Sequence, residues 1–505
     1  MSQKLYLSAG LVILIIVAVN LVGHEFHLRL DFTEDQEYTL SDATGNILEE
    51  LEDPVTVKAY FSQNMPPDIA RTRQDFQEML IEYANRSDGK VVYEFINPNA
   101  SDADEKEAIN NGVQPVMINV REKDQMKQQK AFLGAVLTYD GKQEVIPFVH
   151  PGAAMEYALS TAIKKLSVKE RPLIGFLSGH GEAPLDELIE AREALSVLYT
   201  TQEVRLSDTT DIPPAVKTLV IVRPTDSIPA SHLARLDAFM ARGGNVVVAI
   251  NRVDGNLQNA TGSAIATGME KWLATKGLEV QDDFVVDAKC AAITVQQQMA
   301  FGMMQQQLQF PYLPVIASFS GHPIAKGLEA VVMQFASTIR FVGDTSKRFT
   351  PLAFTSGQSN ALKAPQYFDI QKQWTEADFP QQQLVVAALV EGKFSGNTRA
   401  GLVVVGDGDF PINGPQQQAR RLQPDNVHLL VNSVDYLSDD TGLIDLRTKG
   451  ATARPIHQLE DGTKTLLKYT NFLLPVLLAV GYGVYRAQRN KMKRYKWMSE
   501  NYEEA

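Results

Sequence analysis

The sequence predicts an α/β protein with two soluble domains, flanked by one transmembrane helix at each end. Three observations support this prediction. An apolar run lies near each terminus, β-branched strands alternate with helices up to about residue 168, and continuous apolar strands with intervening helices follow. At 505 residues the chain is longer than one ordinary hydrophobic core requires. Its 44% hydrophobic and 21% charged residues are typical of a globular protein.

The first apolar run covers residues 5–23 and contains no charged residue. At the helical rise it spans roughly 28 Å, which is close to the hydrocarbon thickness of a bilayer. A cleaved signal peptide is the alternative, because only Lys4 precedes the run. No small-x-small cleavage site follows before His24, however. We therefore expect an uncleaved anchor, with residues 1–4 in the cytoplasm.

The second apolar run covers residues 465–485, and a buried core helix is the alternative interpretation. The residues that follow argue against it, because six cations crowd the next eleven positions: Arg486, Arg489, Lys491, Lys493, Arg494 and Lys496. The positive-inside rule assigns such a segment, here residues 486–505, to the cytoplasm. Both termini are then expected inside the cell, and residues from about 24 to 464 on the other side of the membrane.

The first soluble domain is expected over residues 24–168. Its strands are predicted at 55–62, 91–96, 116–120, 132–139 and 143–149, and its helices at 69–85, 104–110 and 155–166. An Asp140-Gly141 turn joins the last two strands. We interpret the order as that of a thioredoxin-like fold, with Pro115 before the third strand. Residues 63–66, at the place of a redox pair, contain no cysteine, which excludes thiol chemistry.

The second soluble domain is expected over residues 169–464. Its strands are predicted at 172–177, 216–222, 245–250 and 401–405, and its helices at 185–199, 231–242 and 427–437. Continuous apolar strands that alternate with amphipathic helices favour a parallel sheet covered on both faces. Ligands of such sheets bind at the carboxyl ends of the strands. Residues 252–395 are less regular, and we interpret them as an insertion or a further subdomain.

One polar loop follows the first strand of this domain and contains Gly179, His180, Gly181 and Glu182. The glycines allow a backbone to approach a ligand, and His180 with Glu182 could act as acid, base or metal ligand. One histidine and one carboxylate do not define a catalytic site without a nucleophile or a third ligand nearby. A fold-defining turn or a binding loop is therefore the favoured interpretation.

A second polar loop follows the strand at 401–405 and contains Asp407 and Asp409. Two carboxylates could hold a hard cation, but the further acidic positions of a calcium loop are missing. A strand-to-helix turn with aspartate caps is the alternative.

The sequence also lacks several motifs that would define an enzyme or a metal site. It contains no P-loop, no nucleophile elbow, no His-Glu-x-x-His and no Cys-x-x-Cys. The single cysteine, Cys290, cannot form an intrachain disulfide and is interpreted as a small apolar residue. Only His24 and His27 among eight histidines share helical spacing, and a surface role near the membrane is favoured for them. We expect no cofactor and no resident metal.

The sequence does not predict nucleic acid as a partner of this chain. The formal net charge is −12, and no basic stripe with interleaved aromatic residues occurs in the interior of the sequence. Membrane lipid is the partner that the two apolar runs predict, and the sequence leaves open whether the chain forms a homo-oligomer.

Several segments in this order resemble the gliding-motility ABC-transporter auxiliary family of the GldG type. They are residues 38–42, 54–61 and 157–165, the Gly179–Glu182 turn, residues 322–324, 403–410, 432–437 and 443–447. The resemblance spans nearly the whole chain, and the ordered set carries its specificity. The sequence differs at Gly408, where members of the family often carry a serine, and its Gln-rich insertions are unusually long.

The resemblance implies a non-enzymatic, substrate-binding-like auxiliary subunit in a bacterial inner membrane, with its main body in the periplasm. Such a subunit works with an ABC-type permease and a separate cytoplasmic ATPase. The resemblance also implies that the larger domain is similar to class I glutamine amidotransferases without the catalytic cysteine. Two rival hypotheses are a membrane-tethered periplasmic hydrolase that uses His180, Glu182 and Asp409, and a structural spacer in an envelope complex.

Overall fold

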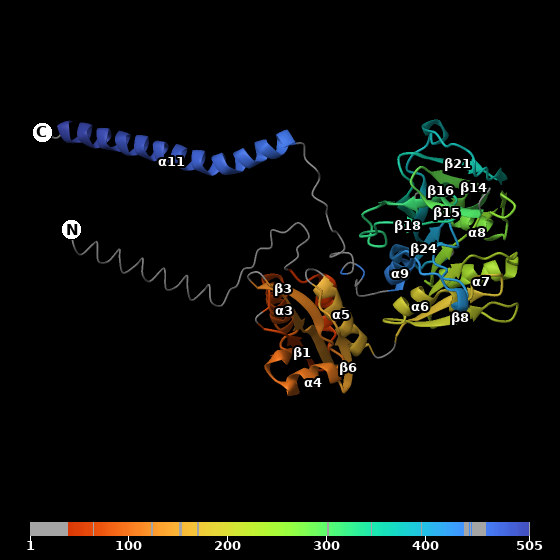
Figure 1. Ribbon diagram of the computed structural model, residues 1–505, viewed down its shortest axis with the longest axis horizontal. Coiled ribbons are helices and arrows are strands. Elements are labelled where there is room, and N and C mark those ends of the chain that lie inside the picture. Colours follow the sequence, from red (N-terminus) through yellow and green to blue (C-terminus); the bar gives the residue numbers. More distant parts are fainter. Residues whose placement is uncertain are drawn as a thin grey trace. The chain divides into compact units, whose positions relative to one another are not determined.

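The computed structural model describes residues 39–503, except positions 64, 123–124, 151–153, 169–170, 300–301, 345, 395, 439–443, 445 and 447–460 (Figure 1). The chain divides into two units, Met1–Thr452 and Ala453–Ala505. The anchor expected over 5–23 lies outside the described residues, as do His24 and His27.

A four-stranded sheet forms the centre of the N-terminal domain. Its order is β2-β1-β5-β6. β1 (Val55–Phe61) pairs in parallel with β2 (Val91–Ile96) and antiparallel with β5 (Leu133–Tyr139), which pairs antiparallel with β6 (Lys142–Ile146). The Asp140-Gly141 turn joins β5 and β6 as the sequence predicts, and both residues have positive φ.

Helices cover both faces of this sheet, because successive side chains of a strand point to opposite sides. One face packs against α2 (Asp42–Glu49), α3 (Pro67–Arg86) and α5 (Ala154–Ser167), and the other against α4 (Asp102–Asn110), which follows the short helix η1 (Pro98–Ala100). Leu446, from a distant part of the chain, is buried in the core beneath α2, α3 and α5.

The strand expected at 116–120 lies outside this sheet. It is part of β3 (Val116–Glu122), which pairs only with β4 (Gln125–Ala131) in a two-stranded hairpin. The third strand of the sheet is β5, so the placement of Pro115 before that strand was wrong. The sequence did not predict β4, since its residues QMKQQKA are mostly polar and lack β-branched side chains.

An eight-stranded sheet forms the centre of the larger domain, in the order β17-β20-β23-β24-β10-β9-β7-β8. The parallel strands are β7 (Leu173–Ser178), β8 (Thr200–Arg205), β9 (Val216–Val222), β10 (Asn245–Ala249) and β24 (Ala400–Val405). β23 (Val385–Gly392), β20 (Arg348–Phe354) and β17 (Ser318–Phe319) continue it antiparallel. The sheet is therefore mixed, whereas the sequence predicts a parallel one.

Both faces of the large sheet are covered, as the continuous apolar strands predict. Val247 and Ala249 of β10 face the core that contains α6 (Ile189–Leu195) and α9 (Pro424–Ser438). Val246 and Val248 face the opposite core, which contains α7 (Ala230–Ala241) and α8 (Met269–Lys276). The short helices η2 (Leu185–Glu187), η3 (Glu376–Asp378) and η4 (Gln416–Gln418) lie in connections.

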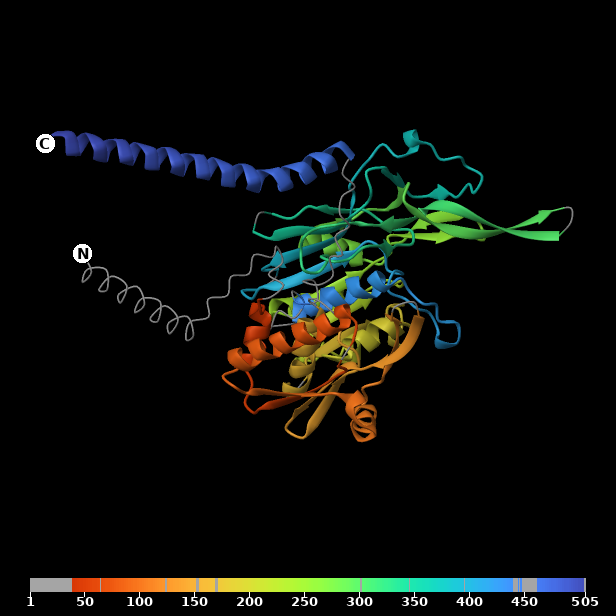
Figure 2. The same ribbon diagram turned by 60° about the vertical axis from the view of Figure 1, so that its left-hand side comes forward.

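Residues 252–395 supply β17, β20 and β23 to the large sheet and form several smaller sheets. These consist of β11 (Val253–Asn256), β12 (Thr261–Ala264) and β22 (Gln366–Tyr367); β13 (Leu278–Val280) and β19 (Ile339–Phe341); β14 (Asp283–Asp287) and β21 (Ser359–Lys363); and β15 (Cys290–Met299), β16 (Gly302–Ile316) and β18 (Val331–Val332). The long β15–β16 hairpin projects from the domain (Figure 2). An aromatic core that includes Phe284, Phe310, Phe335 and Phe368 joins β11, β14, β16 and β21, whereas β13 and β19 pack into the core with α7 and α8.

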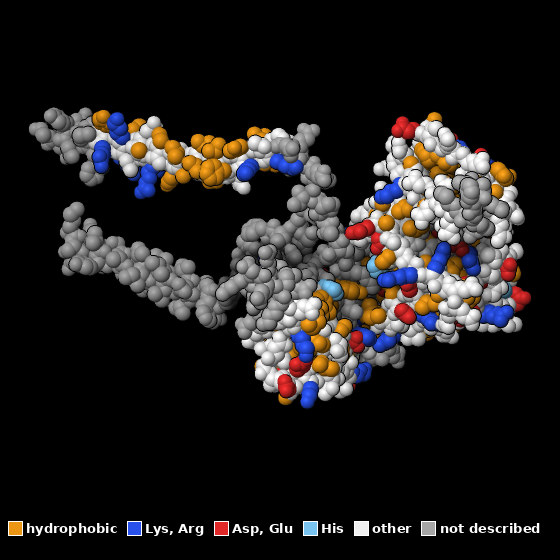
Figure 3. All heavy atoms as spheres, in the orientation of Figure 1, with side chains coloured by type: hydrophobic (Ala, Val, Ile, Leu, Met, Phe, Trp, Pro, Cys, Tyr) orange, Lys and Arg blue, Asp and Glu red, His pale blue; other side chains and the backbone are white. Residues whose placement is uncertain are grey.

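The second unit contains one long helix, α11 (Asp461–Glu503). Its segment Gly462–Tyr495 is long and apolar enough to cross a membrane, and it is the one such helix among the described residues. Apolar side chains gather along its middle, with lysines and arginines toward both ends (Figure 3). A helix therefore forms where the second apolar run was expected, and it continues into the basic segment that starts at Arg486.

Candidate functional site

The carboxyl ends of β7, β9, β10 and β24 lie at one edge of the large sheet. From β7 the chain forms β8 on one side and later β9 on the other side, so the order of strands reverses at β7. In open α/β sheets ligands bind beside the carboxyl ends of the strands at such a point. The two polar loops predicted from the sequence follow β7 and β24 at this edge.

The loop after β7 is held tightly against the turn after β9. The carbonyl oxygen of His180 accepts hydrogen bonds from the backbone N–H groups of Thr225 (3.1 Å) and Asp226 (2.9 Å). The hydroxyl of Thr225 donates to the carbonyl oxygen of Gly181 at 3.2 Å. Gly181 has φ +74°, and a Cβ there would lie 2.0 Å from Oγ1 of Thr225. Only glycine fits this close approach without a shift.

His180 and Glu182, which the sequence singled out together, are in contact and buried. Nδ1 of His180 lies 3.1 Å from Oε1 of Glu182, and the two side chains are 4% and 1% exposed. The other carboxylate oxygen of Glu182 accepts a hydrogen bond of 2.6 Å from the His180 backbone N–H. Glu182 therefore fixes both the ring and the backbone of His180.

The sequence did not predict the next partner of His180. Its Nε2 lies 2.8 Å from Nδ1 of His232, which α7 carries, and Nε2 of His232 lies 3.5 Å from Oδ1 of the exposed Asp208. A chain of polar contacts thus leads from Glu182 through two imidazoles to the surface. Both ring nitrogens of His180 are engaged, which leaves neither free to act on a bound substrate in this arrangement.

The two carboxylates of the loop after β24 form hydrogen bonds and an ion pair with other residues of the protein. Asp407 is fully buried and accepts hydrogen bonds of 2.7 Å from the backbone N–H groups of Gln334 and Asp409. Burial, and secondarily the charge of Asp409, raise the pKa of Asp407 above its ordinary value. Asp407 thus ties residues before β19 to the end of β24.

Asp409 lies in a compact cluster with residues that follow β9 and β10. Its Oδ1 lies 2.9 Å from Nη1 of Arg223, and its Oδ2 accepts a 2.6 Å hydrogen bond from Nδ2 of Asn251. The side-chain oxygen of Asn251 in turn accepts from the Gly408 backbone N–H at 2.6 Å. A Cβ on Gly408 would lie 3.0 Å from Arg223, so the glycine permits this close approach.

Arg223 is the strained residue of this edge. Its φ is +53°, a conformation that residues other than glycine rarely adopt, and its Nε is buried without a hydrogen-bond partner among the described residues. Such strain is common where a structure fixes a functional group in place. The turn from Arg223 to Asp226 contacts the β24 loop at one end and the β7 loop at the other.

The hydrolase hypothesis required His180, Glu182 and Asp409 to act together. His180 contacts Glu182, whereas the described contacts of the Asp409 carboxylate are with Arg223 and Asn251. Within the described residues, no group of three or more His, Cys, Asp or Glu side chains is placed to hold a metal ion. Cys290 is the first residue of β15, which is not a strand of the large sheet. Burial raises the pKa of its thiol.

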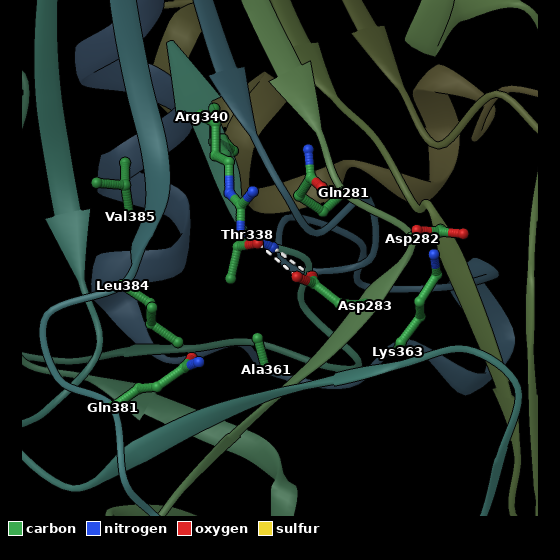
Figure 4. Close-up of a pocket in the computed structure, with 11 residues that line it drawn as sticks. Gln281, Asp282, Asp283, Thr338, Arg340, Ala361, Lys363, Gln381, Leu384 and Val385 are labelled. Carbon is green, nitrogen blue, oxygen red and sulfur yellow. Dashed lines mark hydrogen bonds between the residues drawn. The ribbon is translucent and has the colours of Figure 1, made fainter.

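A cavity of about 320 Å³ lies among residues of the 252–395 segment and the start of β23 (Figure 4). Its polar lining includes Gln281, Asp282, Asp283, Thr338, Arg340, Lys363 and Gln381. Both Asp283 oxygens accept hydrogen bonds from Thr338, at 2.8 Å from its N–H and 2.5 Å from its hydroxyl, and burial raises the Asp283 pKa. Sequence reasoning missed this cavity, because the strands around it come from a segment whose pairing had no readable pattern.

Fold and site together define an α/β protein with a mixed, doubly covered sheet and a rigid polar edge. The chain belongs to the family described as an ABC-type uncharacterized transport system, whose model matches residues 171–437. A second model, for a domain of unknown function, matches residues 34–138. The protein is accordingly an auxiliary component associated with ABC-type transport, and α11 gives it a membrane-compatible helix.

A similar protein of Borreliella burgdorferi, described as uncharacterized, is 21% identical over 97% of this chain and 98% of its own length. Among solved structures, the mmIFT52 N-terminal domain matches 52% of this chain and 96% of its own, with 14% identity and a TM-score of 0.35. A thua-like protein from Parabacteroides merdae matches 54% and 91%, with 12% identity and a TM-score of 0.31.

Proposed function

We propose that this chain is a non-enzymatic auxiliary subunit of an ABC-type transporter, and that it docks on a membrane permease served by a separate cytoplasmic ATPase. The observation that carries the proposal is α11, an exposed apolar helix with a basic end, in a chain whose larger domain belongs to an ABC-type transport family. In this role α11 packs against the permease, and the α/β body presents a binding surface for cargo or for a partner protein.

The proposed topology is two-pass in a bacterial inner membrane, with both termini in the cytoplasm and the main body in the periplasm. The cations that follow the apolar part of α11 support a cytoplasmic C-terminus, because positively charged flanks are retained inside. The uncharged run at 5–23 supplies the second span in this proposal. The spans then enter and leave the membrane in opposite directions.

We assign the two soluble domains to a thioredoxin-like and a non-catalytic, class I glutamine amidotransferase-like fold. The order β2-β1-β5-β6, with β1 and β2 parallel and β5 and β6 antiparallel, supports the first assignment. The parallel strands from β8 to β24 with helices on both faces support the second. A thiolate nucleophile is absent from the carboxyl edge, since the single cysteine lies in β15.

A periplasmic hydrolase is the second candidate, and the contact between His180 and Glu182 is the observation that favours it. A general base needs a free nitrogen within reach of the proton that it removes. His232 occupies that nitrogen, and no described serine, threonine or cysteine side chain is hydrogen-bonded to the His180 ring. We therefore favour a structural role for His180 and Glu182, in which they fix the β7 loop.

A structural spacer in an envelope complex is the third hypothesis. Such a spacer would need no polar cavity of the kind that Figure 4 draws.

The partner assignment is tested by purifying the full-length tagged chain from membranes in a mild detergent. An ABC permease and an ATPase should copurify in constant proportion, and an unrelated two-span membrane protein with the same tag serves as the control. Recovery of the chain alone under conditions that keep other transporters intact would contradict the proposal.

A link to gliding motility or to export is tested by deleting the gene and measuring both processes.

Topology and chemistry need separate experiments. Protease added to spheroplasts should digest the α/β body without lysis, and protection of the body would refute the periplasmic location.

The hydrolase hypothesis is tested by a His180→Ala variant. A variant that folds and copurifies with the same partners should retain transport. Loss of transport in such a variant, together with stoichiometric metal in the purified protein, would favour the hydrolase instead.

A further inference from the structure

A second cavity, of about 740 Å³, lies at the edge of the large sheet opposite to the polar loops. β23 runs antiparallel to both of its neighbours, β20 and β24. The end of β23 therefore lies beside the beginnings of β20 and β24. This topology brings Arg348, the first residue of β20, together with Lys393, which follows β23, and Arg399, which precedes β24.

These three cations line the cavity without a described partner. No hydrogen bond or ion pair joins the side chain of Arg348, Lys393 or Arg399 to another residue in the part of the chain that the structure describes, although the backbone of Arg348 pairs with that of Glu391. The acid among the lining residues is Glu391, which already accepts a hydrogen bond of 3.2 Å from the Tyr436 hydroxyl. The cavity thus carries an excess of positive charge in a chain whose formal net charge is −12.

The wall of the cavity is held by the side chain of Asn245 rather than by the cations. Asn245 donates a 2.6 Å hydrogen bond from Nδ2 to the carbonyl oxygen of Leu437, and its side-chain oxygen accepts one of 2.7 Å from the Gly401 N–H. These bonds join the start of β10, the start of β24 and the last turn of α9. Because the wall does not depend on them, the three cations remain available to a ligand.

We propose that this cavity binds a small anionic molecule through its phosphate or carboxylate groups, with Arg348 and Arg399 as the main contacts. Guanidinium groups match the geometry of both anions through paired N–H donors. The volume suits a small molecule, since ligand pockets measure roughly 300–1,000 Å³. The carboxyl end of α9 opposes an anion, but its partial charge of about −0.5 is smaller than the excess of the side chains. The inference is independent of the proposed transport role.

Isothermal titration calorimetry of the detergent-solubilised full-length chain tests this proposal, with pyrophosphate and citrate as probes at constant ionic strength. The wild-type chain should show saturable binding of at least one probe, and R348Q/R399Q should bind at least about tenfold more weakly. Binding of only pyrophosphate assigns a phosphate ligand, and binding of only citrate assigns a carboxylate ligand. R421Q, which removes an exposed arginine outside the lining, should retain the wild-type affinity.

Several results would overturn the proposal. They are the absence of saturable binding for both probes, or equal affinity in R348Q/R399Q and wild type. If the double variant unfolds, the single variant R399Q should still weaken binding severalfold, and an unchanged affinity there counts against the site. Asp439 and Asp440 follow α9 in the sequence and lie outside the described residues. Binding seen only in D439N/D440N would mean that these acids neutralise the cavity in the native chain, which also refutes the inference.

Discussion

Replacement of Gly181 by alanine should destabilise the larger domain by two separable effects. The first is conformational, because a residue with a Cβ at φ +74° costs about 1–2 kcal/mol. The second is steric, because the new Cβ would lie 2.0 Å from Oγ1 of Thr225, and overpacking of this kind typically costs about 1–3 kcal/mol. The total loss in the free energy of unfolding should therefore be about 2–5 kcal/mol.

Two further variants separate these effects. G414A places alanine at φ +89° in open space, so it should show the conformational cost alone. T225A by itself should cost about 0.5–1.5 kcal/mol, because it removes the hydrogen bond to Gly181. In the G181A background T225A should instead be neutral or stabilising, because it removes the clashing hydroxyl.

Urea unfolding followed by tryptophan fluorescence measures all of these free energies, since Trp272 and Trp374 report on the larger domain. The reasoning is refuted if G181A costs no more than G414A. It is also refuted if T225A costs as much beside alanine at position 181 as it does in the wild-type chain.

Three further changes test other parts of the molecule. The pKa of Asp407 is raised in the folded chain, so its contribution to stability is complete in acid and is lost as pH rises. The melting temperature of the wild type should therefore fall relative to D407N from about pH 4 to about pH 8, and a constant difference would contradict the buried carboxyl. F284A should cost about 3–5 kcal/mol in urea unfolding, because Phe284 is buried against Tyr312, Phe335 and Phe368; a loss below about 1 kcal/mol would mean that this core is dispensable. L477R should reduce the carbonate-resistant membrane fraction, since an arginine at the centre of a span costs about 2.5–3.5 kcal/mol, whereas L466R near the helix end should have little effect; equal behaviour of the two variants would argue against α11 as a span.

The sequence predicts the strands that are buried and apolar, and it misses those whose residues are polar. β9, β10 and β24 carry continuous runs of valine, isoleucine and leucine, which leave little choice of structure. β8 lies at the sheet edge and is mostly exposed, so its residues TTQEVR carry no strong signal. The antiparallel strands of 252–395 depend on pairings between distant residues, which local periodicity cannot reveal.

The same distinction applies to the candidate site. His180 and Glu182 are two residues apart, so their contact was open to prediction from the loop alone. His232 lies 52 residues from His180 and reaches it only because α7 packs beside β7 and β9. The cationic cavity is likewise invisible in the sequence, since Arg348, Lys393 and Arg399 meet only through the antiparallel arrangement of β20, β23 and β24.

The burial of Leu446 in the N-terminal domain has a consequence for biosynthesis. The ribosome completes α5 about 280 residues before it adds Leu446, an interval of roughly 14–56 s at about 5–20 residues per second. During that interval the core beneath α2, α3 and α5 lacks one of its apolar side chains and stays open to solvent or to a chaperone. The domain that is translated first is thus among the last parts of the molecule to reach its final packing.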